Sequence, residues 1–484
     1  MPTWGKLSGR PLNQLETMPS LTRRSFLAGT ALAAATPALG AVPASGDTDI
    51  IIVGAGAAGI AAARRIADAK RRFVLVEAAD RIGGRCVTDT QTFGVPYDRG
   101  ARWIHLPDVN PVTKLAARSG LDIYRAPPGQ KLRIGRRYAR EGEVEEFLAA
   151  LVRSTRAIGE AARSGKSDVS CAQALPKDLL EWRSSIEFVL GPYGCGKDLT
   201  EISAADFAQS AERDTDSLCR QGFGTLLAKL AEGIPVQLGT PVTQIEWGTR
   251  SSGVDVETPR GKLSARLVIV TVPTPLITSG QIKFRPDLPK RQLDAAARLP
   301  PGSYDHIMLE LSGNPLGLQR DDLMFEKAEG SRTAALLANL SGTTLTQVDV
   351  GGKFGRDLAA QGEAAMVDFA QEWLGNLYGS DVKKAVKRRS ATRWNEEPWA
   401  LGAFSGATPG GQPSRRILME PLGRLYFAGE ATHETLWGTV GGAWESGERA
   451  ADLALKRFTA PLESEKPKRK PSGKPKRKPS GRRA

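Results

Sequence analysis

Glycines and one acid at a fixed spacing form the first candidate site in this chain of 484 residues. An apolar run, Ile50–Val53, leads into GAGAAG at 54–59, and a second apolar run, Phe73–Val76, ends on Glu77. This order predicts a strand, a tight turn, a helix and a second strand. The helix N-terminus offers N–H donors and a positive dipole to phosphates, and the acid can bind ribose hydroxyls. The spacing therefore predicts a dinucleotide-binding site.

A second glycine turn, Arg81-Ile-Gly83-Gly84-Arg85, follows the acid. Two glycines let the backbone lie close under a flat ring system, and arginines pair with phosphate oxygens through two parallel hydrogen bonds. The turn and its position after the acid resemble a signature shared by the flavin-containing amine oxidases and their relatives, and this resemblance implies FAD as the bound cofactor.

The charge of the chain is concentrated at its C-terminus. Of a net charge of +14, ten lysines and arginines lie between 466 and 484 without an acid, which leaves about +4 for the remainder. The body of the protein gives no case for a nucleic-acid-binding face, so no specific nucleic-acid partner is expected. The tail combines proline and charge without apolar residues, which predicts disorder and, as its partner, an anionic envelope surface.

The four cysteines, Cys86, Cys171, Cys195 and Cys219, contain no CxxC pair and no zinc-ligand spacing. No metal site is expected. Buried thiols are the favoured interpretation, and a disulfide in an oxidising compartment stays open.

An export signal is expected near the N-terminus. Thr22-Arg-Arg-Ser-Phe-Leu27 precedes a mild apolar run that ends at Leu39, which resembles a bacterial twin-arginine signal. The run is too short and too weakly apolar for a membrane span. This resemblance implies the twin-arginine translocase as a partner and a periplasmic or secreted location for the folded protein.

Runs of strand and helix pattern divide the rest of the chain. We expect an α/β fold, with a discontinuous Rossmann-like FAD-binding domain of the glutathione-reductase type and an inserted α+β substrate domain. The expected boundaries are 1–45 for the signal, 46–108, 205–285 and 397–459 for the FAD domain, 109–204 and 286–396 for the substrate domain, and 460–484 for the tail. Helices are expected over 141–164 and 357–378, and strands over 304–311 and within 333–350.

Four further segments, at 98–111, 270–289, 393–405 and 427–447, resemble the flavin-containing amine oxidases of the monoamine and polyamine oxidase type. They include DRGARWIH, VTVP, RWNEEPWALGAFS and FAGEAT, in the order of that family. The resemblance covers nearly all of residues 47–458 and carries the FAD assignment with it.

Site residues follow from these motifs and from the resemblance. The expected cofactor-binding residues are Gly54, Gly56, Ala58, Gly59, Glu77, Arg81, Gly83, Gly84, Arg85, Ala101, Arg102, Trp103, Val242, Trp394, Gly429, Glu430, Thr439 and Val440. The expected catalytic residues are His306, Phe404, Trp103, His105, Trp399 and Thr439. In the resemblance Glu430 binds the ribityl and phosphate region of FAD.

Three departures from the family pattern bear on function. Ala403 stands where some members tether the flavin through a cysteine, which implies non-covalent FAD. His306 stands at the position of a lysine that holds water beside flavin N5, and a neutral imidazole is expected to take over that role. Phe404 supplies one face of the aromatic cage, while the other position is Thr439, for which Trp437 compensates.

The resemblance implies hydride transfer from the α-carbon of a small-molecule amine to flavin N5. The imine formed hydrolyses to an aldehyde or ketone, and O₂ reoxidises the flavin with release of H₂O₂.

Alternatives remain open. Electrons could pass to a periplasmic redox protein instead of O₂. An L-amino-acid oxidase would need an arginine clamp such as Arg102, a C–C desaturase shares only the FAD motifs, and a chromatin-type demethylase conflicts with the export signal. A non-enzymatic flavin-binding module with a polyanion-binding tail is the last alternative.

Overall fold

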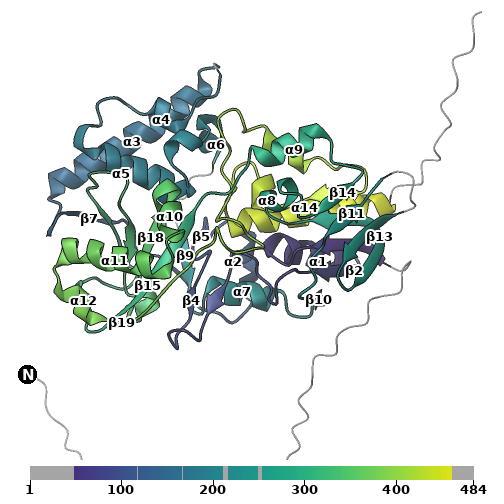
Figure 1. Cartoon of the computed structure of the whole chain (residues 1–484), viewed down its shortest axis with the longest axis horizontal. Coiled ribbons are helices and arrows are strands. Elements are labelled where there is room, and N and C mark those ends of the chain that lie inside the picture. Colours follow the sequence, from purple (N-terminus) through teal and green to yellow (C-terminus); the bar gives the residue numbers. More distant parts are fainter. Residues whose placement is uncertain (1–47, 117, 166, 211–215, 249–252, 460–484) are drawn as a thin grey trace, which may run out of the picture. The chain divides into compact units, whose positions relative to one another are not determined.

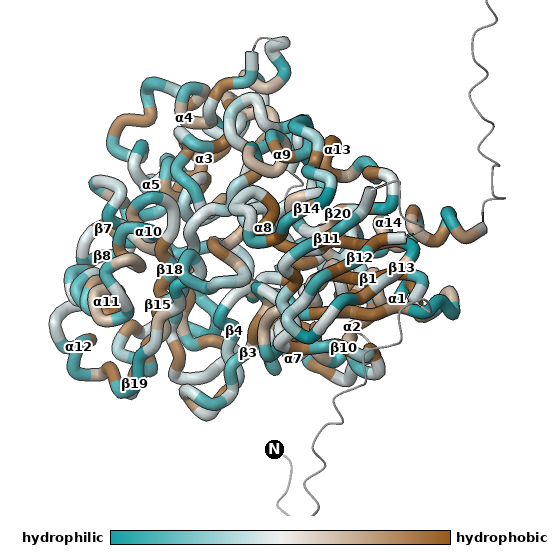
Figure 2. The backbone as a smooth tube through the Cα atoms, turned by 45° about the vertical axis from the view of Figure 1, so that its right-hand side comes forward, coloured by the Kyte–Doolittle hydropathy of each residue, from teal (hydrophilic) through white to brown (hydrophobic). Residues whose placement is uncertain are grey.

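The apolar run before the first glycine turn becomes the buried strand β1 (Thr48–Val53) at the centre of a sheet (Figure 1). The computed structural model describes residues 48–459 apart from 117, 166, 211–215 and 249–252, so the expected export signal and tail lie outside the described residues. β1 runs parallel to β2 (Phe73–Val76) and to β13 (Gly261–Val270). Hydrophobic stretches follow β1 and β13 in Figure 2, as expected for parallel strands that are covered on both faces.

The first sheet has the strand order β10-β2-β1-β13-β12-β11-β14, with β20 paired to β13. The remaining bounds are β10 (Val236–Gln237), β11 (Gln244–Glu246), β12 (Val254–Thr258), β14 (Lys283–Arg285) and β20 (Leu425–Phe427). These strands come from three separate stretches of the chain, which all fall within the ranges expected for the FAD domain.

The second sheet has the order β19-β15-β18-β17-β16-β7-β8. Its strands are β7 (Lys131–Ile134), β8 (Arg137–Tyr138), β15 (Tyr304–Leu311), β16 (Leu323–Glu326), β17 (Ala335–Leu337), β18 (Leu345–Gly351) and β19 (Val386–Ala391). They fall within the ranges expected for the substrate domain. The assignment of the two sheets to separate domains stays a prediction.

Two small sheets complete the strand structure of the described residues. One pairs β3 (Thr88–Asp89) with β4 (Tyr97–Asp98), and the other has the order β5-β9-β6. Strands β5 (Ile104–His105) and β9 (Asp216–Cys219) fall within the ranges expected for the FAD domain, whereas β6 (Ile123–Arg125) falls within the first insert. This sheet therefore ties the two expected ranges together.

Helices cover both large sheets, as Figure 1 shows. With the first sheet lie α1 (Ala57–Asp68), α2 (Pro111–Ala116), α7 (Phe223–Leu230), α8 (Thr274–Thr278), α9 (Lys290–Ala297), α13 (Ser414–Met419) and α14 (Val440–Thr459). With the second lie α3 (Glu141–Arg163), α4 (Cys171–Ala174), α5 (Arg183–Phe188), α6 (Ala204–Gln209), α10 (Gly352–Ala359), α11 (Glu363–Tyr378) and α12 (Asp381–Ala385).

Helices α1 and α14 approach each other closely because both carry small residues. A Cβ added to Gly447 would lie 2.0 Å from the Ala58 carbonyl oxygen, so only glycine fits there. One expected helix, 357–378, is instead two, α10 and α11. The chain between them passes through Gly362 with φ of 97°, a conformation that breaks a helix.

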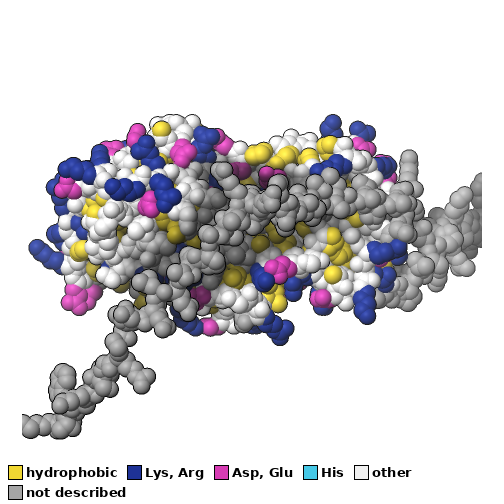
Figure 3. Space-filling model, turned by 90° about the horizontal axis from the view of Figure 1, so that it is seen from below, with side chains coloured by type: hydrophobic (Ala, Val, Ile, Leu, Met, Phe, Trp, Pro, Cys, Tyr) yellow, Lys and Arg dark blue, Asp and Glu magenta, His cyan; other side chains and the backbone are white. Residues whose placement is uncertain are grey.

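The surface charges, the hydropathy of the helices and the state of the cysteines can be compared with the expectations from composition. Figure 3 shows lysines, arginines and acids interspersed over one face of the described part. Within residues 48–459, outside the gaps, no helix is long and apolar enough to cross a membrane. All four cysteines are buried free thiols, so the favoured interpretation holds in the structure.

Candidate active site

The first glycine turn connects β1 to α1 as expected. Gly54 has φ of 101°, and a Cβ on Gly59 would lie 1.8 Å from the Gly54 carbonyl oxygen, which keeps both positions as glycine. Glu77 at the end of β2 is buried, and its carboxylate accepts hydrogen bonds from the backbone N–H groups of Ala55 at 2.7 Å and Ala79 at 2.9 Å. The acid therefore holds the turn in shape at the edge of the site.

The second glycine turn lies against the first. Gly83 and Gly84 have φ of 102° and 58°, and the backbone of Gly83 forms a bridge with that of Gly56. The Arg81 guanidinium donates to the Gly84 carbonyl at 2.8 Å, so Arg81 fixes its own turn. The two turns form one continuous backbone cradle that side chains do not fill.

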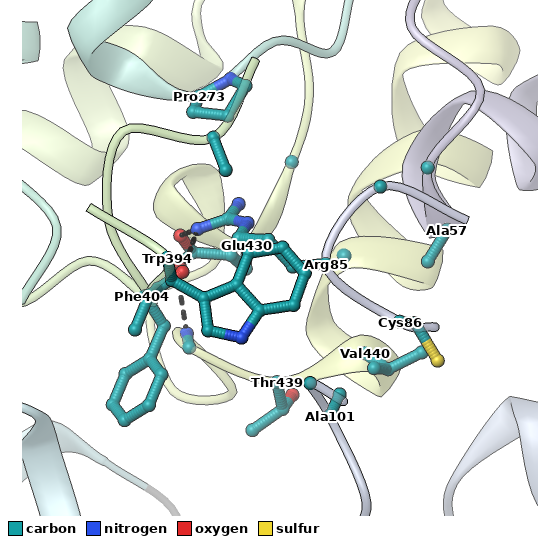
Figure 4. A pocket seen from close by; sticks show the side chains of 18 of the residues that line it. Ala57, Arg85, Cys86, Ala101, Pro273, Trp394, Phe404, Glu430, Thr439 and Val440 are labelled. Carbon is teal, nitrogen blue, oxygen red and sulfur yellow. Dashed lines mark hydrogen bonds and ion pairs between the residues drawn. The ribbon is translucent and has the colours of Figure 1, made fainter. Parts of the chain in front are cut away.

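Glu430 occupies the centre of a buried hydrogen-bond network. Its carboxylate accepts from the Ser405 N–H at 3.0 Å, the Ser405 hydroxyl at 2.7 Å and the Gly438 N–H at 2.9 Å, and it pairs with Arg85 at 3.1 Å (Figure 4). Burial alone raises the pKa of this carboxyl, but Arg85 and Ser405 bring the pKa below its ordinary value. These donors anchor the carboxylate at the wall of the cavity, and its expected role at the ribityl chain stays a prediction.

Arg102 is directed away from any substrate carboxylate. Its guanidinium is buried and pairs with the buried Asp321 at 3.4 Å. The arginine clamp that an L-amino-acid oxidase needs is therefore not provided by this side chain. His105 on β5 is similarly engaged, since its Nδ1 lies 2.6 Å from an Asp216 carboxylate oxygen.

His306 on β15 is buried and bonded on both ring nitrogens. Nδ1 lies 2.6 Å from an Asp349 oxygen, and Nε2 lies 3.0 Å from the Gly100 carbonyl oxygen. The side-chain amide nitrogen of Gln347 also lies 2.9 Å from Nδ1. The two acceptors, Asp349 and the Gly100 carbonyl, favour the imidazolium form, which can donate to both. Burial alone lowers the pKa of His306, but Asp349, the Gly100 carbonyl and Asp305 together outweigh it, so the pKa lies above its ordinary value. The expected water-holding role of His306 stays a prediction, and in this structure the ring bonds to the loop at Gly100.

An aromatic wall stands beside this clamp. The Phe404 ring lies 5.9 Å from that of Tyr304, and the Tyr304 ring lies 6.2 Å from that of Tyr193 (centroid distances). Trp437 is buried and also lines the cavity. The rings next to Phe404 thus come from the substrate-domain segments and from Trp437, which extends the cage expected around Phe404 and Thr439.

Thr439 acts at the start of α14. Its hydroxyl donates to the Leu436 carbonyl at 2.7 Å and accepts from the Gly442 N–H at 2.9 Å. These bonds occupy the hydroxyl in capping the helix, so the structure gives it no free group for catalysis.

Two tryptophans of the 393–405 segment differ in exposure. Trp394 is buried, and its indole N–H donates to the Arg99 carbonyl at 2.9 Å; Figure 4 shows it beside Phe404 and above Thr439. Trp399 is 39 % exposed. Trp394 therefore belongs to the interior of the site and Trp399 to its opening.

All of the expected site residues except Gly59 line one continuous cavity of about 1730 Å³. This volume exceeds that of ordinary small-molecule pockets, so it has room for a cofactor and a substrate together. Gly59 packs behind the first turn, where there is no room for a side chain.

Sequence reasoning missed two of the residues that build the wall, Tyr304 and Tyr193. Tyr304 lies two residues before His306 on the same face of β15, and its hydroxyl donates to Asp349 at 3.1 Å. Tyr193 lies in the run Pro192-Tyr-Gly-Cys-Gly196, which interrupts a helical stretch. The proline and glycines around this aromatic residue were the sequence signal that could have indicated an irregular, functional turn at Tyr193.

FAD fits these residues. The cradle of 54–56 and 83–84 and the start of α1 line the cavity. The first N–H groups of a helix have no partner within the helix, so a pyrophosphate can bind there. Beyond it, residues 100–103 together with Trp394 and Phe404 enclose space for a flat ring system. Across the described ranges, no group of His, Cys, Asp or Glu could hold a metal ion.

Known proteins give consistent comparisons. A family model described as flavin containing amine oxidoreductase matches residues 57–455. Polyamine oxidase 2 of Arabidopsis thaliana is 28% identical, over 83% of this chain and 87% of the relative, and polyamine oxidase 4 of Oryza sativa subsp. japonica is 27% identical, over 84% and 89%. The fold is similar to that of cyclohexylamine oxidase from Brevibacterium oxydans, with a TM-score of 0.72 and 22% identity over 86% of this chain and 100% of the other.

Proposed function

Because the chain belongs to the flavin-containing amine oxidoreductase family, we propose that it oxidises amines that carry an apolar body. The protein is an FAD-dependent amine oxidase, an oxidoreductase that acts on amines. The wall of the cavity is the feature that bears on the choice of amine.

In this proposal the residues of the chain bind FAD, orient the amine and shield both from water. When bound, FAD supplies a hydride acceptor for the carbon next to the amine nitrogen, and the imine released hydrolyses to an aldehyde or ketone. The two glycine turns and α1 hold the dinucleotide, Arg85 and Glu430 fix the loops around it, and His306 clamps the segment at Gly100. Phe404 and the neighbouring rings exclude water and hold the amine close to the ring system.

The observation that carries the proposed substrate class is the apolar substrate side of the cavity. It is lined largely by apolar and aromatic residues, among them Leu151, Val189, Leu190, Tyr193, Phe207, Tyr304, Phe404 and Trp437. Of the five acids that line the cavity, Glu77, Asp216 and Glu430 already have hydrogen-bond or ion-pair partners. Burying a second ammonium group without a counter-ion would be costly, so an amine with an apolar body fits best.

Polyamine oxidation is the second candidate. Glu397 lines the cavity two residues before Trp399, and its carboxylate has no ion pair among the described residues. It could meet a distal ammonium group. The names of the plant relatives also favour this candidate.

A matched pair of substrates separates the candidates. We expect n-hexylamine to reduce the flavin anaerobically with an efficiency at least about tenfold above that of 1,6-diaminohexane, because about 1.4 kcal/mol of desolvation cost already gives a factor of ten. Glu397→Gln should leave this ratio unchanged. Glu396→Gln is the control, since Glu396 pairs with Arg393 and does not line the cavity.

A preference for the diamine that disappears only in Glu397→Gln would favour polyamine oxidation. Failure of every amine to reduce the flavin would contradict the proposed amine oxidase.

Finer features of the proposal rest on the sequence. We expect the FAD-binding part to be of the glutathione-reductase type, on the order β1, glycine turn, α1, β2. We expect O₂ as the electron acceptor, with a periplasmic redox protein as the alternative. The twin arginines support export through the translocase to the periplasm, and the basic tail supports attraction to an anionic envelope surface.

A further inference from the structure

Several polar side chains of the cavity near Phe404 are engaged within the protein. The Tyr304 hydroxyl donates to Asp349, both nitrogens of His306 are bonded, and Arg102 pairs with Asp321. Tyr193 differs from them. Its side chain lines the cavity, and its hydroxyl has no hydrogen-bond partner among the described residues.

The backbone at Tyr193 is unusual. Helix α5 continues into a π-helical turn, Val189–Tyr193, which contains Pro192. Such wide turns are rare and occur frequently at functional sites, because they displace one residue from the regular helix face. Here the turn ends at Tyr193, which lines the cavity.

Packing holds the Tyr193 ring in place. Phe325 meets it edge-on, with ring centroids 4.9 Å apart and planes at 87°, and Phe188 lies 6.3 Å away. On its other side the row continues through Tyr304 to Phe404. A ring fixed in this way can present its hydroxyl in one position without losing further side-chain entropy on binding.

We propose that the Tyr193 hydroxyl binds the nitrogen of the substrate amine by accepting one of its N–H hydrogen bonds. This inference rests on the proposed function and names a positioning residue for it. The phenol oxygen is an acceptor, and an N–H donor becomes stronger as the nitrogen gains positive charge during hydride loss. The hydrogen bond is therefore stronger in the transition state than in the bound substrate, which is the condition for it to increase the rate.

The electrostatic surroundings agree with this role. Burial raises the pKa of Tyr193, and the carboxylates of Asp349 and Asp216 raise it further. The side chain therefore stays a neutral phenol across the working pH range.

An isosteric ligand pair tests the proposal. α,α-Dimethylbenzylamine has no α-hydrogen and cannot be oxidised, and tert-butylbenzene replaces its amino group by a methyl group. Both are titrated into the FAD-loaded protein and followed by the difference spectrum of the flavin. In Tyr193→Phe we expect the dissociation constant of the amine to rise about three- to tenfold, the effect of one lost hydrogen bond, and that of tert-butylbenzene to stay unchanged.

Tyr97→Phe is the matched control. The Tyr97 hydroxyl donates to Asp89 at 3.2 Å and the residue does not line the cavity, so neither ligand should respond to its loss. With n-hexylamine as substrate, Tyr193→Phe should also slow anaerobic flavin reduction and leave reoxidation by O₂ unchanged.

An unchanged preference for the amine in Tyr193→Phe, while the wild-type flavin is still reduced by amines, would overturn this inference and leave the proposed function intact. An equal loss of affinity for both ligands would also overturn it, because that result indicates a packing role. If Tyr193→Phe does not retain FAD, Tyr193→Met repeats the comparison, and loss of FAD in both variants would refute a role at the amine. A wild-type flavin that no amine reduces would refute the proposed function itself.

Discussion

Replacement of His306 by glutamine tests the electrostatics of the site most directly. The imidazolium is buried, and it donates to Asp349 and to the carbonyl of Gly100. Glutamine is neutral, so Asp349 would lose its cationic partner and keep only the Tyr304 and Gln347 donors. Breaking a buried ion pair by removing one partner costs about 3–5 kcal/mol of unfolding free energy.

The pH dependence of this cost has a defined sign. Asp349 and, more weakly, Asp305 face His306, and the pKa of His306 in the folded state lies above its ordinary value despite the opposing effect of burial. The stabilisation is therefore complete below about pH 6.5 and is lost as the pH rises through the folded-state pKa. Across that window the wild type should lose up to about 1.4 kcal/mol per pH unit that His306→Gln does not lose.

The assay is urea unfolding of the FAD-loaded protein at about pH 6, 7 and 8, followed by tryptophan fluorescence. His433→Gln is the control, because His433 pairs with Glu445 in a partly exposed position and should cost at most about 1 kcal/mol. A loss below about 1 kcal/mol in His306→Gln near pH 6, or the same pH slope as in the wild type, would refute the imidazolium assignment.

Further predictions concern the cofactor and the two ends of the chain. Glu77→Ala removes a carboxylate that accepts two backbone N–H groups, each bond worth about 1.5–3 kcal/mol, so FAD affinity should fall at least tenfold; unchanged flavin occupancy on equilibrium dialysis would contradict the dinucleotide assignment. Trichloroacetic acid should release the yellow flavin into the supernatant, since Ala403 offers no thiol for a tether, and a coloured pellet would count against non-covalent FAD. Replacing Arg23 and Arg24 by lysine should retain folded protein in the cytoplasm, and normal delivery to the periplasm would point to another route. Truncation after Leu462 should weaken binding to anionic vesicles at low salt and leave turnover unchanged; reduced turnover would place the tail at the active site.

The sequence by itself determined the dinucleotide part of this protein. Strand β1, the glycine turn, helix α1 and the acid at the end of β2 follow one another within thirty residues or so, and each is required by local geometry, as the close approach of Gly59 to Gly54 illustrates. The same is true of the segments that carry Trp394, Phe404 and Glu430, whose order identified the family. The local sequence pattern was sufficient to predict these elements, because the backbone conformation at each position requires the residue type found there and no partner distant in the sequence is needed.

Tertiary structure alone decided what several of those side chains do. His306 meets Asp349 only because β15 and β18 pair antiparallel in the register that places them opposite each other, and that partner raises the pKa of the buried imidazole. Glu430 turns toward Ser405 and Gly438, which no spacing in the sequence brings to it. Tyr193 faces the chamber because a π-helical turn displaces it from a helix that periodicity alone would continue. Charge, protonation and hydrogen bonding depend on neighbours that are distant in sequence, and only the folded chain fixes which neighbours those are.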